Sequence, residues 1–116
     1  MYLLIAPYTH QSSLVKKARA RATLDVANSL GTEVMAPSLY AHLIGETGET
    51  FNLHALTFSL LRNVNGVIAY KLPGYQIDEE FKKTIEAAVA LDIPVQMMDP
   101  YPSHLQGNYA DVWQSL

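Results

Sequence analysis

The chain has 116 residues, a formal net charge of −3, and an apolar fraction of 49% against 16% charged residues. This length allows one domain with one core, and this composition excludes a disordered or fibrous protein. The slightly negative charge gives no general attraction to nucleic acids or anionic membranes, so neither is expected as a partner.

The absence of cysteine excludes a disulfide, a thiolate nucleophile and a Cys-based zinc site. The opening sequence MYLLIAPY has no basic segment, and its apolar run is too short for a signal peptide or a membrane span. We therefore expect a soluble, cytoplasmic domain.

Four short apolar runs are typical of β-strands, and three longer stretches between them are typical of helices. The predicted strands cover residues 2–6, 33–36, 66–70 and 93–98. The predicted helices cover residues 13–30, 51–62 and 77–91. This alternation predicts right-handed crossovers and an α/β fold, namely a small doubly wound (Rossmann- or flavodoxin-like) parallel sheet of about four or five strands with flanking helices.

The apolar spacing of each predicted helix indicates the face that it buries. The stripe in the first helix consists of Leu14, Ala18, Ala22, Val26 and Leu30. Ser12 or Ser13 can cap this helix, and Gly31 stands where it would stop. The second helix is apolar nearly all round, so we expect it to be largely buried, with His54 as a core or interface residue. The third helix is expected to bury Ile77, Phe81, Ile85 and Ala88.

Residues 1–98 therefore form the predicted α/β domain, and residues 99–116 form a carboxy-terminal tail. The phrase GETGET at 45–50 is predicted to be an acidic loop. The tail is too apolar to extend into solvent, so it is expected to pack either on the body or on a neighbouring subunit. Its apolar residues are Leu105, Tyr109, Val112, Trp113 and Leu116.

Each predicted strand runs into a phrase that contains proline and tyrosine: APY, APSLY, LPGY and DPY. In a parallel sheet these phrases share the carboxyl edge, where ligands bind near the topological switch point. Aromatic rings with polar tips suit a flat heteroaromatic ligand, whereas the alternative is that the phrases only make turns. The residues gathered at this edge are Tyr8, Tyr40, Tyr75 and Tyr101, with His10 and His42 in the same loops.

The common signatures of cofactor sites are absent. Neither G-x-G-x-x-G nor G-x-x-x-x-G-K-[ST] occurs, and the four histidines show no metal-ligand spacing, so neither a cofactor nor a metal is expected. A nucleophile elbow G-x-S-x-G is also missing.

Several phrases in order resemble the nucleoside 2-deoxyribosyltransferase family, in particular its short, often phage-borne relatives. These phrases are YLLIAPYTH, Arg19 about ten residues later, VMAPSLYAH, VIAYKLPGY and AVALDIPV, spread over residues 2–98. The resemblance implies a doubly wound fold, a nucleoside or nucleotide ligand at the strand ends, and a homo-oligomer whose subunits complete each other's sites. It also implies attack by a glutamate on the anomeric carbon of the sugar.

Carried over residue by residue, the resemblance implies ligand contacts for Tyr8, Arg19, His42 and Tyr75, and for a tail residue that would be Asn108. His10 is a further predicted ligand contact, from its place in the loop after the first strand. The catalytic phrase differs. Counted from Gly74, the family's serine, glycine and nucleophilic glutamate fall on Asp78, Glu80 and Thr84. Two further family aspartates fall on Thr57 and Asn65.

Helical geometry sets the expected roles of these residues. At about 100° per residue, Thr84 lies in the inward sector of its helix and Glu80 at the edge of that sector. Asp78 is placed to cap the helix, and both Asp78 and Thr84 are predicted ligand contacts. Threonine cannot replace a carboxylate nucleophile without a neighbouring base, which leaves Glu80 as the candidate catalytic residue.

Three functions remain open from the sequence. The first is a non-catalytic binder of a nucleoside or nucleotide derivative, sequestering a nucleotide-derived signal in the manner of a phage counter-defence protein. The second is an N-glycosidase or deoxyribosyltransferase with Glu80 as relocated carboxylate. The third is an interaction module, for which the apolar tail with Trp113 is the indication.

Overall fold

The protein is described by a computed structural model that covers residues 1–48 and 51–116, so the predicted acidic loop lies partly outside the described residues. Its core is a parallel sheet of four strands in the order β2-β1-β3-β4. The strands are β1 (Tyr2–Ile5), β2 (Val34–Met35), β3 (Gly66–Tyr70) and β4 (Val95–Met98). The predicted α/β fold is therefore confirmed, with each strand at or inside its predicted bounds.

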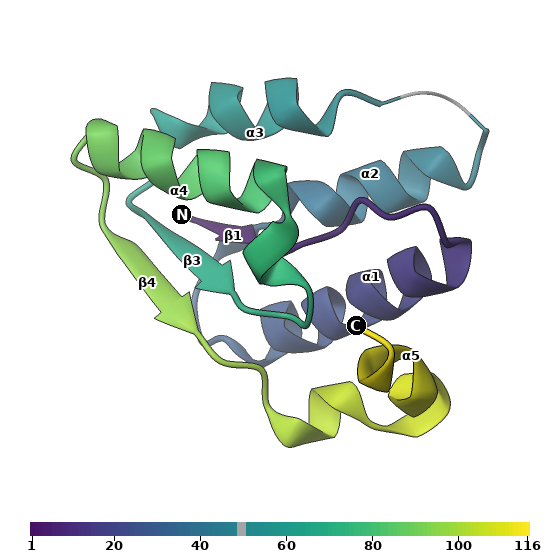
Figure 1. The fold of residues 1–116 in the computed structure, drawn as a ribbon. Helices are drawn as coiled ribbons and strands as arrows, with labels where there is room; N and C mark the ends of the chain where they lie inside the picture. The colour runs from purple at the N-terminus through teal and green to yellow at the C-terminus, as the bar shows by residue number, and fades with distance from the viewer. Residues whose placement is uncertain (49–50) are drawn as a thin grey trace.

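Helices cover both faces of the sheet (Figure 1). They are α1 (Ser13–Ser29), α2 (Pro37–Gly45), α3 (Leu53–Leu61), α4 (Glu79–Ala90) and the short α5 (Ala110–Gln114). Alternate strand residues point to opposite faces, so each central strand supplies two cores. Leu4 and Ile68 pack under α1 and α5, whereas Leu3 and Val67 pack under α3 and α4.

The strand order places the topological switch point between β1 and β3. From β1 the chain moves outward to β2, then crosses back through α2 and α3 to β3 on the other side of β1. The loops that follow β1 and β3 consequently diverge over opposite faces. Such a divergence leaves an opening at the carboxyl ends of the two strands.

The first helix begins and ends close to the predicted positions. The hydroxyl of Ser12 accepts a hydrogen bond from the Val15 amide at 3.4 Å, and the helix ends at Ser29. Ala18, Ala22 and Val26 are buried as predicted. The prediction for Leu14 is wrong, because this side chain is 51% exposed and Val15 takes the inward position in the first turn.

Two predictions for the middle of the chain are also wrong. The helix α2 starts at Pro37, inside a phrase interpreted above as a turn. Proline fits the first helical turn because no intrahelical partner exists there for its missing amide hydrogen. The helix α3 buries only Thr57 and Leu61, one helical turn apart, because it lies on the sheet by one face. His54 lies on the same side of the helix, three residues before Thr57, but in the first turn, where it is exposed.

The helix α4 buries Phe81, Thr84 and Ala88, as its spacing predicts. Ile77 is 83% exposed, contrary to the prediction. The reason is that residues Tyr75–Ile77 form a separate 3-10 turn, so the helical phase of α4 does not extend back to Ile77.

The tail packs on the body of the same chain, which is one of the two predicted alternatives. Two short 3-10 turns, Pro102–Leu105 and Gly107–Tyr109, lead into α5. Val112 and Trp113 are buried in the same cluster as Ala18 and Ala22 of α1. Within residues 1–48 and 51–116, no helix combines the length and apolarity needed to cross a bilayer.

Replacing Trp113 by alanine tests this packing. Trp113 is 7% exposed, and its loss leaves a cavity against α1, so we expect a destabilisation of about 3–5 kcal/mol in chemical denaturation. Leu116→Ala, at a residue that is 37% exposed, should change stability far less. Because Trp113 is the one tryptophan of the chain, its emission reports the burial directly. Solvent-exposed emission in the native wild type would contradict the packing.

Candidate functional site

The largest cavity described, of about 850 Å³, lies at the switch point between the chain segments that follow β1 and β3. Its walls come from the loop after β1, the beginning of α3 and the beginning of α4. We call it the switch-point cavity. Its lining consists of Thr9, Phe51, Asn52, Leu53, His54, Ile77, Asp78, Glu79 and Glu80.

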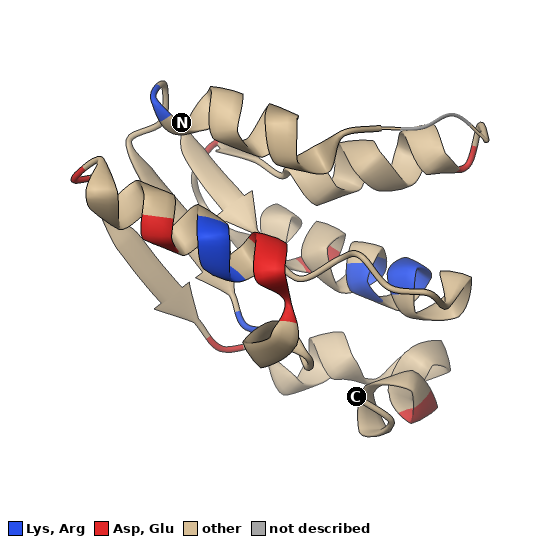
Figure 2. Ribbon diagram, turned by 45° about the horizontal axis from the view of Figure 1, so that its top comes forward, with Lys and Arg blue, Asp and Glu red and all other residues tan. Residues whose placement is uncertain are grey.

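The lining combines apolar side chains with acidic ones. Phe51, Leu53 and Ile77 offer apolar surface, whereas the start of α4 contributes three carboxylates. Figure 2 shows this acidic beginning of α4 in red, with the basic residues of α1 in blue. No lysine or arginine occurs among the residues that line the described cavity. The cavity therefore favours neutral or hydrogen-bond-donating ligands over anions.

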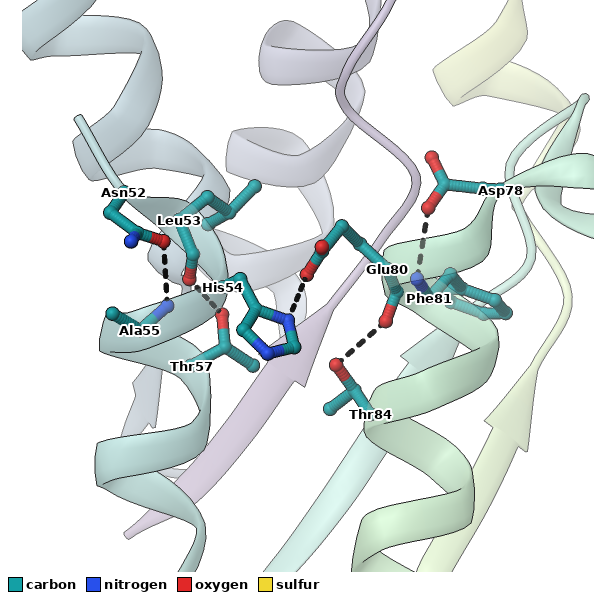
Figure 3. Close-up of polar contacts among 9 residues, drawn as sticks. All are labelled: Asn52, Leu53, His54, Ala55, Thr57, Asp78, Glu80, Phe81 and Thr84. Carbon is teal, nitrogen blue, oxygen red and sulfur yellow. Dashed lines mark hydrogen bonds and ion pairs between the residues drawn. The ribbon is translucent and has the colours of Figure 1, made fainter. Parts of the chain in front are cut away.

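A histidine–carboxylate pair bridges two walls of the cavity. The side chain of Glu80 reaches from α4 toward α3, where His54 Nδ1 lies 2.9 Å from Glu80 Oε2 (Figure 3). The imidazole also packs on the Phe58 ring, with centroids 4.3 Å apart. The prediction of His54 as a core residue is wrong, since its side chain is 48% exposed. Nothing in the apolar sequence around His54 signalled this contact, which joins residues 26 positions apart.

Asp78 caps α4, as predicted. Its Oδ1 accepts a hydrogen bond from the Phe81 amide at 2.9 Å. Burial raises the pKa of the Asp78 carboxyl, and the Phe81 amide and the Arg19 guanidinium partly oppose this rise. The carboxylate is thus held at the cavity wall in surroundings that disfavour its charge.

Arg19 ties together the two loops that flank the cavity. This side chain is 4% exposed. Its Nη1 donates to the carbonyl of Thr9 at 3.1 Å, and its Nη2 donates to the carbonyl of Pro73 at 3.2 Å. Burial lowers the pKa of the guanidinium, and the nearby Asp78 opposes that shift. The arginine side chain nevertheless stays charged. Its planar guanidinium can donate to two carbonyls at once.

A small recess of about 20 Å³ adjoins the cavity and shares Leu53 and Glu80 with it. The hydroxyls of Thr57 and Thr84 line it, and each donates to the carbonyl one turn earlier in its own helix (Figure 3). Ser38 also lines it, and its buried hydroxyl has no partner among the described residues. The recess is large enough for one water molecule.

The predicted tyrosine-lined cleft is wrong, since none of the four tyrosines lines the switch-point cavity. Tyr40 lies on α2 because Pro37 begins a helix, and Tyr75 packs its ring on Phe81. Tyr101 lies beyond β4, where its ring contacts His104.

Tyr8 and His42 belong to a different, smaller cavity, which they line together with Lys16, Lys17 and Glu46. The Tyr8 hydroxyl is hydrogen-bonded to His42 Nδ1 at 2.9 Å, and His42 Nε2 lies 3.2 Å from Glu46. Tyr8 and His42 thus line a different cavity from Glu80 and Asp78.

Two further predicted contacts lie away from the switch-point cavity. The exposed His10 accepts the Ser12 amide hydrogen at 2.9 Å and so helps to shape the turn before α1. Asn108 lines a cavity formed by α1 and the tail. Of the predicted site residues, the structure thus brings only Asp78 and Glu80 to the switch-point cavity, with Thr84 in the adjoining recess and Arg19 behind its loops.

Gly74→Ala tests the contact between Arg19 and the loop after β3. Gly74 has a φ of 94°, and an added Cβ would lie 2.5 Å from Arg19 Nη2. We expect a loss of about 1–3 kcal/mol of stability in chemical denaturation. Gly31→Ala is the matched control, because its added Cβ meets no atom within 4 Å. Equal effects of the two substitutions would contradict the contact.

Asp78→Asn tests the raised pKa of the cap. Because the folded chain binds the Asp78 proton more tightly than the unfolded chain, folding loses stability as pH rises from the ordinary aspartate pKa through the raised one. Asparagine keeps the capping oxygen and cannot ionise. Relative to wild type, we expect the variant to gain stability as the pH rises above the ordinary aspartate pKa of about 4, until the Asp78 carboxyl of the folded wild type is ionised, in denaturation experiments. Asp78→Ala, which lacks the oxygen, should cost about 1 kcal/mol. A pH-independent difference between Asp78→Asn and wild type would contradict the raised pKa.

Comparison with known proteins adds no assignment. No family model, curated protein or solved structure matches the chain. Within residues 1–48 and 51–116, no group of three or more His, Asp or Glu side chains is arranged to hold a metal ion. The function is therefore argued from the site itself, and the resemblance to deoxyribosyltransferases stays a prediction from short motifs.

Proposed function

We propose that the chain binds a nucleoside-type ligand without a phosphate in the switch-point cavity. The observation that carries the proposal is a cavity of about 850 Å³ at the carboxyl ends of β1 and β3, with apolar and acidic lining. This volume lies in the range of small-molecule sites. The resemblance to deoxyribosyltransferases supports the same ligand class at the same end of the sheet.

The two kinds of lining match the two halves of a nucleoside. Phe51 and Ile77 offer flat and aliphatic surface against which a base can stack. Carboxylates accept hydrogen bonds only, and sugar hydroxyls donate them, so Glu79 and Glu80 suit the sugar. A phosphate would bring negative charge against these carboxylates. This argues against a nucleotide and against the nucleotide-derived signal expected from the sequence.

We do not propose covalent attack on the sugar, the reaction that the resemblance to deoxyribosyltransferases implies. Thr84 stands where that family has its nucleophile, and its buried hydroxyl donates to the Glu80 carbonyl at 2.8 Å. A hydroxyl whose hydrogen is engaged in this way is not prepared to attack a sugar carbon. Binding is therefore proposed without a covalent intermediate on Thr84.

Thermal unfolding with matched ligand pairs tests the proposal. Adenosine and thymidine should raise the melting temperature, whereas their 5′-monophosphates should raise it less. A ligand at about 100 times its dissociation constant stabilises the folded chain by about 2.7 kcal/mol. Phe51→Ala should weaken the nucleoside effect. Tyr101→Ala removes an aromatic ring outside the cavity and should leave it unchanged.

Isothermal titration calorimetry of the same ligands gives the dissociation constants. Stronger binding of the monophosphates than of the nucleosides, or no binding of any nucleoside, would contradict the proposal. Equal weakening by the Phe51 and Tyr101 substitutions would contradict the location.

A further inference from the structure

The strand β4 has an open edge. The sheet order places β4 at one end, where it pairs with β3 alone, and Figure 1 shows no described segment along its outer side. Its sequence is VQMM, without the proline or charged side chains that commonly prevent an edge strand from pairing with another chain. The other edge strand, β2, has only two residues. Of the two edges, β4 is therefore the one that can accept a further strand.

The backbone of β4 presents its free groups in a regular pattern. The carbonyl oxygens of Pro94 and Met98 accept hydrogen bonds from the β3 side, at 2.8 and 2.9 Å. Because backbone groups alternate in direction along a strand, the N–H and C=O groups of Val95 and Met97 point to the open side. Pro94 removes no outward donor, since its own backbone faces β3. The outward groups of β4 are thus available to a second strand.

We propose that this edge pairs with the same edge of a second copy of the chain, in antiparallel orientation, so that the two four-stranded sheets become one continuous sheet. The outward groups fix the register. When Val95 of one copy lies opposite Met97 of the other, the two residues exchange both of their hydrogen bonds. The two-fold axis then passes between the two copies of Gln96.

The side chains of β4 complement their own copies in this register. Gln96 is exposed and lies opposite Gln96 of the second copy. A carboxamide has both donors and an acceptor, so two of them can bond to each other. On the other face of the strand, Met97, which is 46% exposed, lies opposite Val95 and forms an apolar cross-strand pair. The edge therefore suits the same strand of a second copy at each of its positions.

The charges of α4 support the same partner. This helix contacts α3 on one side and β4 on the other, and Glu80 lies on the flank toward α3. At about 100° per residue, the exposed Lys82, Glu86 and Val89 lie on the flank toward β4. The middle of α4 falls between Lys82 and Glu86. A two-fold axis at the middle of β4 therefore brings Lys82 of one copy toward Glu86 of the other, and these charges are opposite.

This interface lies away from the switch-point cavity. The cavity lining includes no residue of β4, and it includes none of Lys82, Glu86 and Val89. Pairing through β4 therefore covers the open edge and leaves the cavity accessible to a ligand. It differs in this respect from the assembly that the resemblance implies, in which subunits complete each other's sites.

Single-cysteine variants test the register, because the chain has no cysteine of its own. Opposite residues of an antiparallel pair that share no hydrogen bond have Cα atoms about 4.5 Å apart, within the range of a disulfide. Gln96→Cys should therefore form a covalent dimer under mild oxidation, seen by non-reducing electrophoresis. Gln114→Cys makes the same change at an exposed residue of α5 and should stay largely uncrosslinked.

Sedimentation velocity of the full chain measures the association itself. The wild type should sediment as a dimer of the 12.9 kDa chain. Gln96→Glu places two carboxylates opposite each other, so it should weaken dimerisation by about tenfold or more, and Gln96→Lys should have the same effect. An equimolar mixture of these two variants should dimerise again, because each charge then lies opposite its counter-charge. Gln114→Glu should leave the dimerisation constant unchanged.

Three outcomes would overturn the proposal. The first is a wild type that stays monomeric at millimolar concentration. The second is a dimer that Gln96→Glu does not weaken, since the association would then use another surface. The third is a mixture of the Glu and Lys variants that stays monomeric. Circular dichroism of each variant should match the wild type, because Gln96 is exposed in the single chain, and this match separates lost association from lost folding.

Discussion

The buried guanidinium of Arg19 is the contact on which the site depends. The loops after β1 and β3 diverge because the strands connect to helices on opposite faces of the sheet. Arg19 reaches from α1 to the carbonyls of Thr9 and Pro73, and so joins the two loops. One charged guanidinium donates to both loop carbonyls, and hydrogen bonds from an ionised donor are stronger than those between neutral groups. The contact also requires glycine at position 74, because the Cβ of any other residue there would lie too close to Arg19 Nη2.

The cavity follows from this arrangement rather than from any phosphate-binding motif. Beside the two loops that Arg19 joins, the beginnings of α3 and α4 face each other across a space of about 850 Å³. The acidic first turn of α4 favours the helix dipole and needs no ligand to explain it. The same carboxylates nevertheless disfavour anionic ligands in the cavity. Helix stability and ligand selection thus depend on the same residues, which is why the acidic turn alone could not be assigned a function.

The polar groups between α3 and α4 also divide into two sets. Thr57 and Thr84 are satisfied by their own helices and lie below the cavity, in the recess with Ser38. His54 and Glu80 are satisfied by each other and lie at the cavity itself. The hydroxyls at the positions that match the deoxyribosyltransferase carboxylates are thus bonded within their own helices, and the His54–Glu80 pair is one helical turn nearer the opening.

The sequence alone determined the fold class, all four strands, the cap at Asp78 and the inward direction of Thr84, because these follow from local spacing and from groups a few residues apart. Only the tertiary structure decided the rest. The phrase around Pro37 suits both a turn and a helix start, and packing against α1 and α3 selected the helix. The apolar α3 buries only Thr57 and Leu61, and His54, in the first turn of this helix, stays exposed and contacts Glu80. Contacts such as that pair, or Arg19 with Pro73, join residues far apart in the chain, and their partners depend on how the helices dock, which no local pattern encodes.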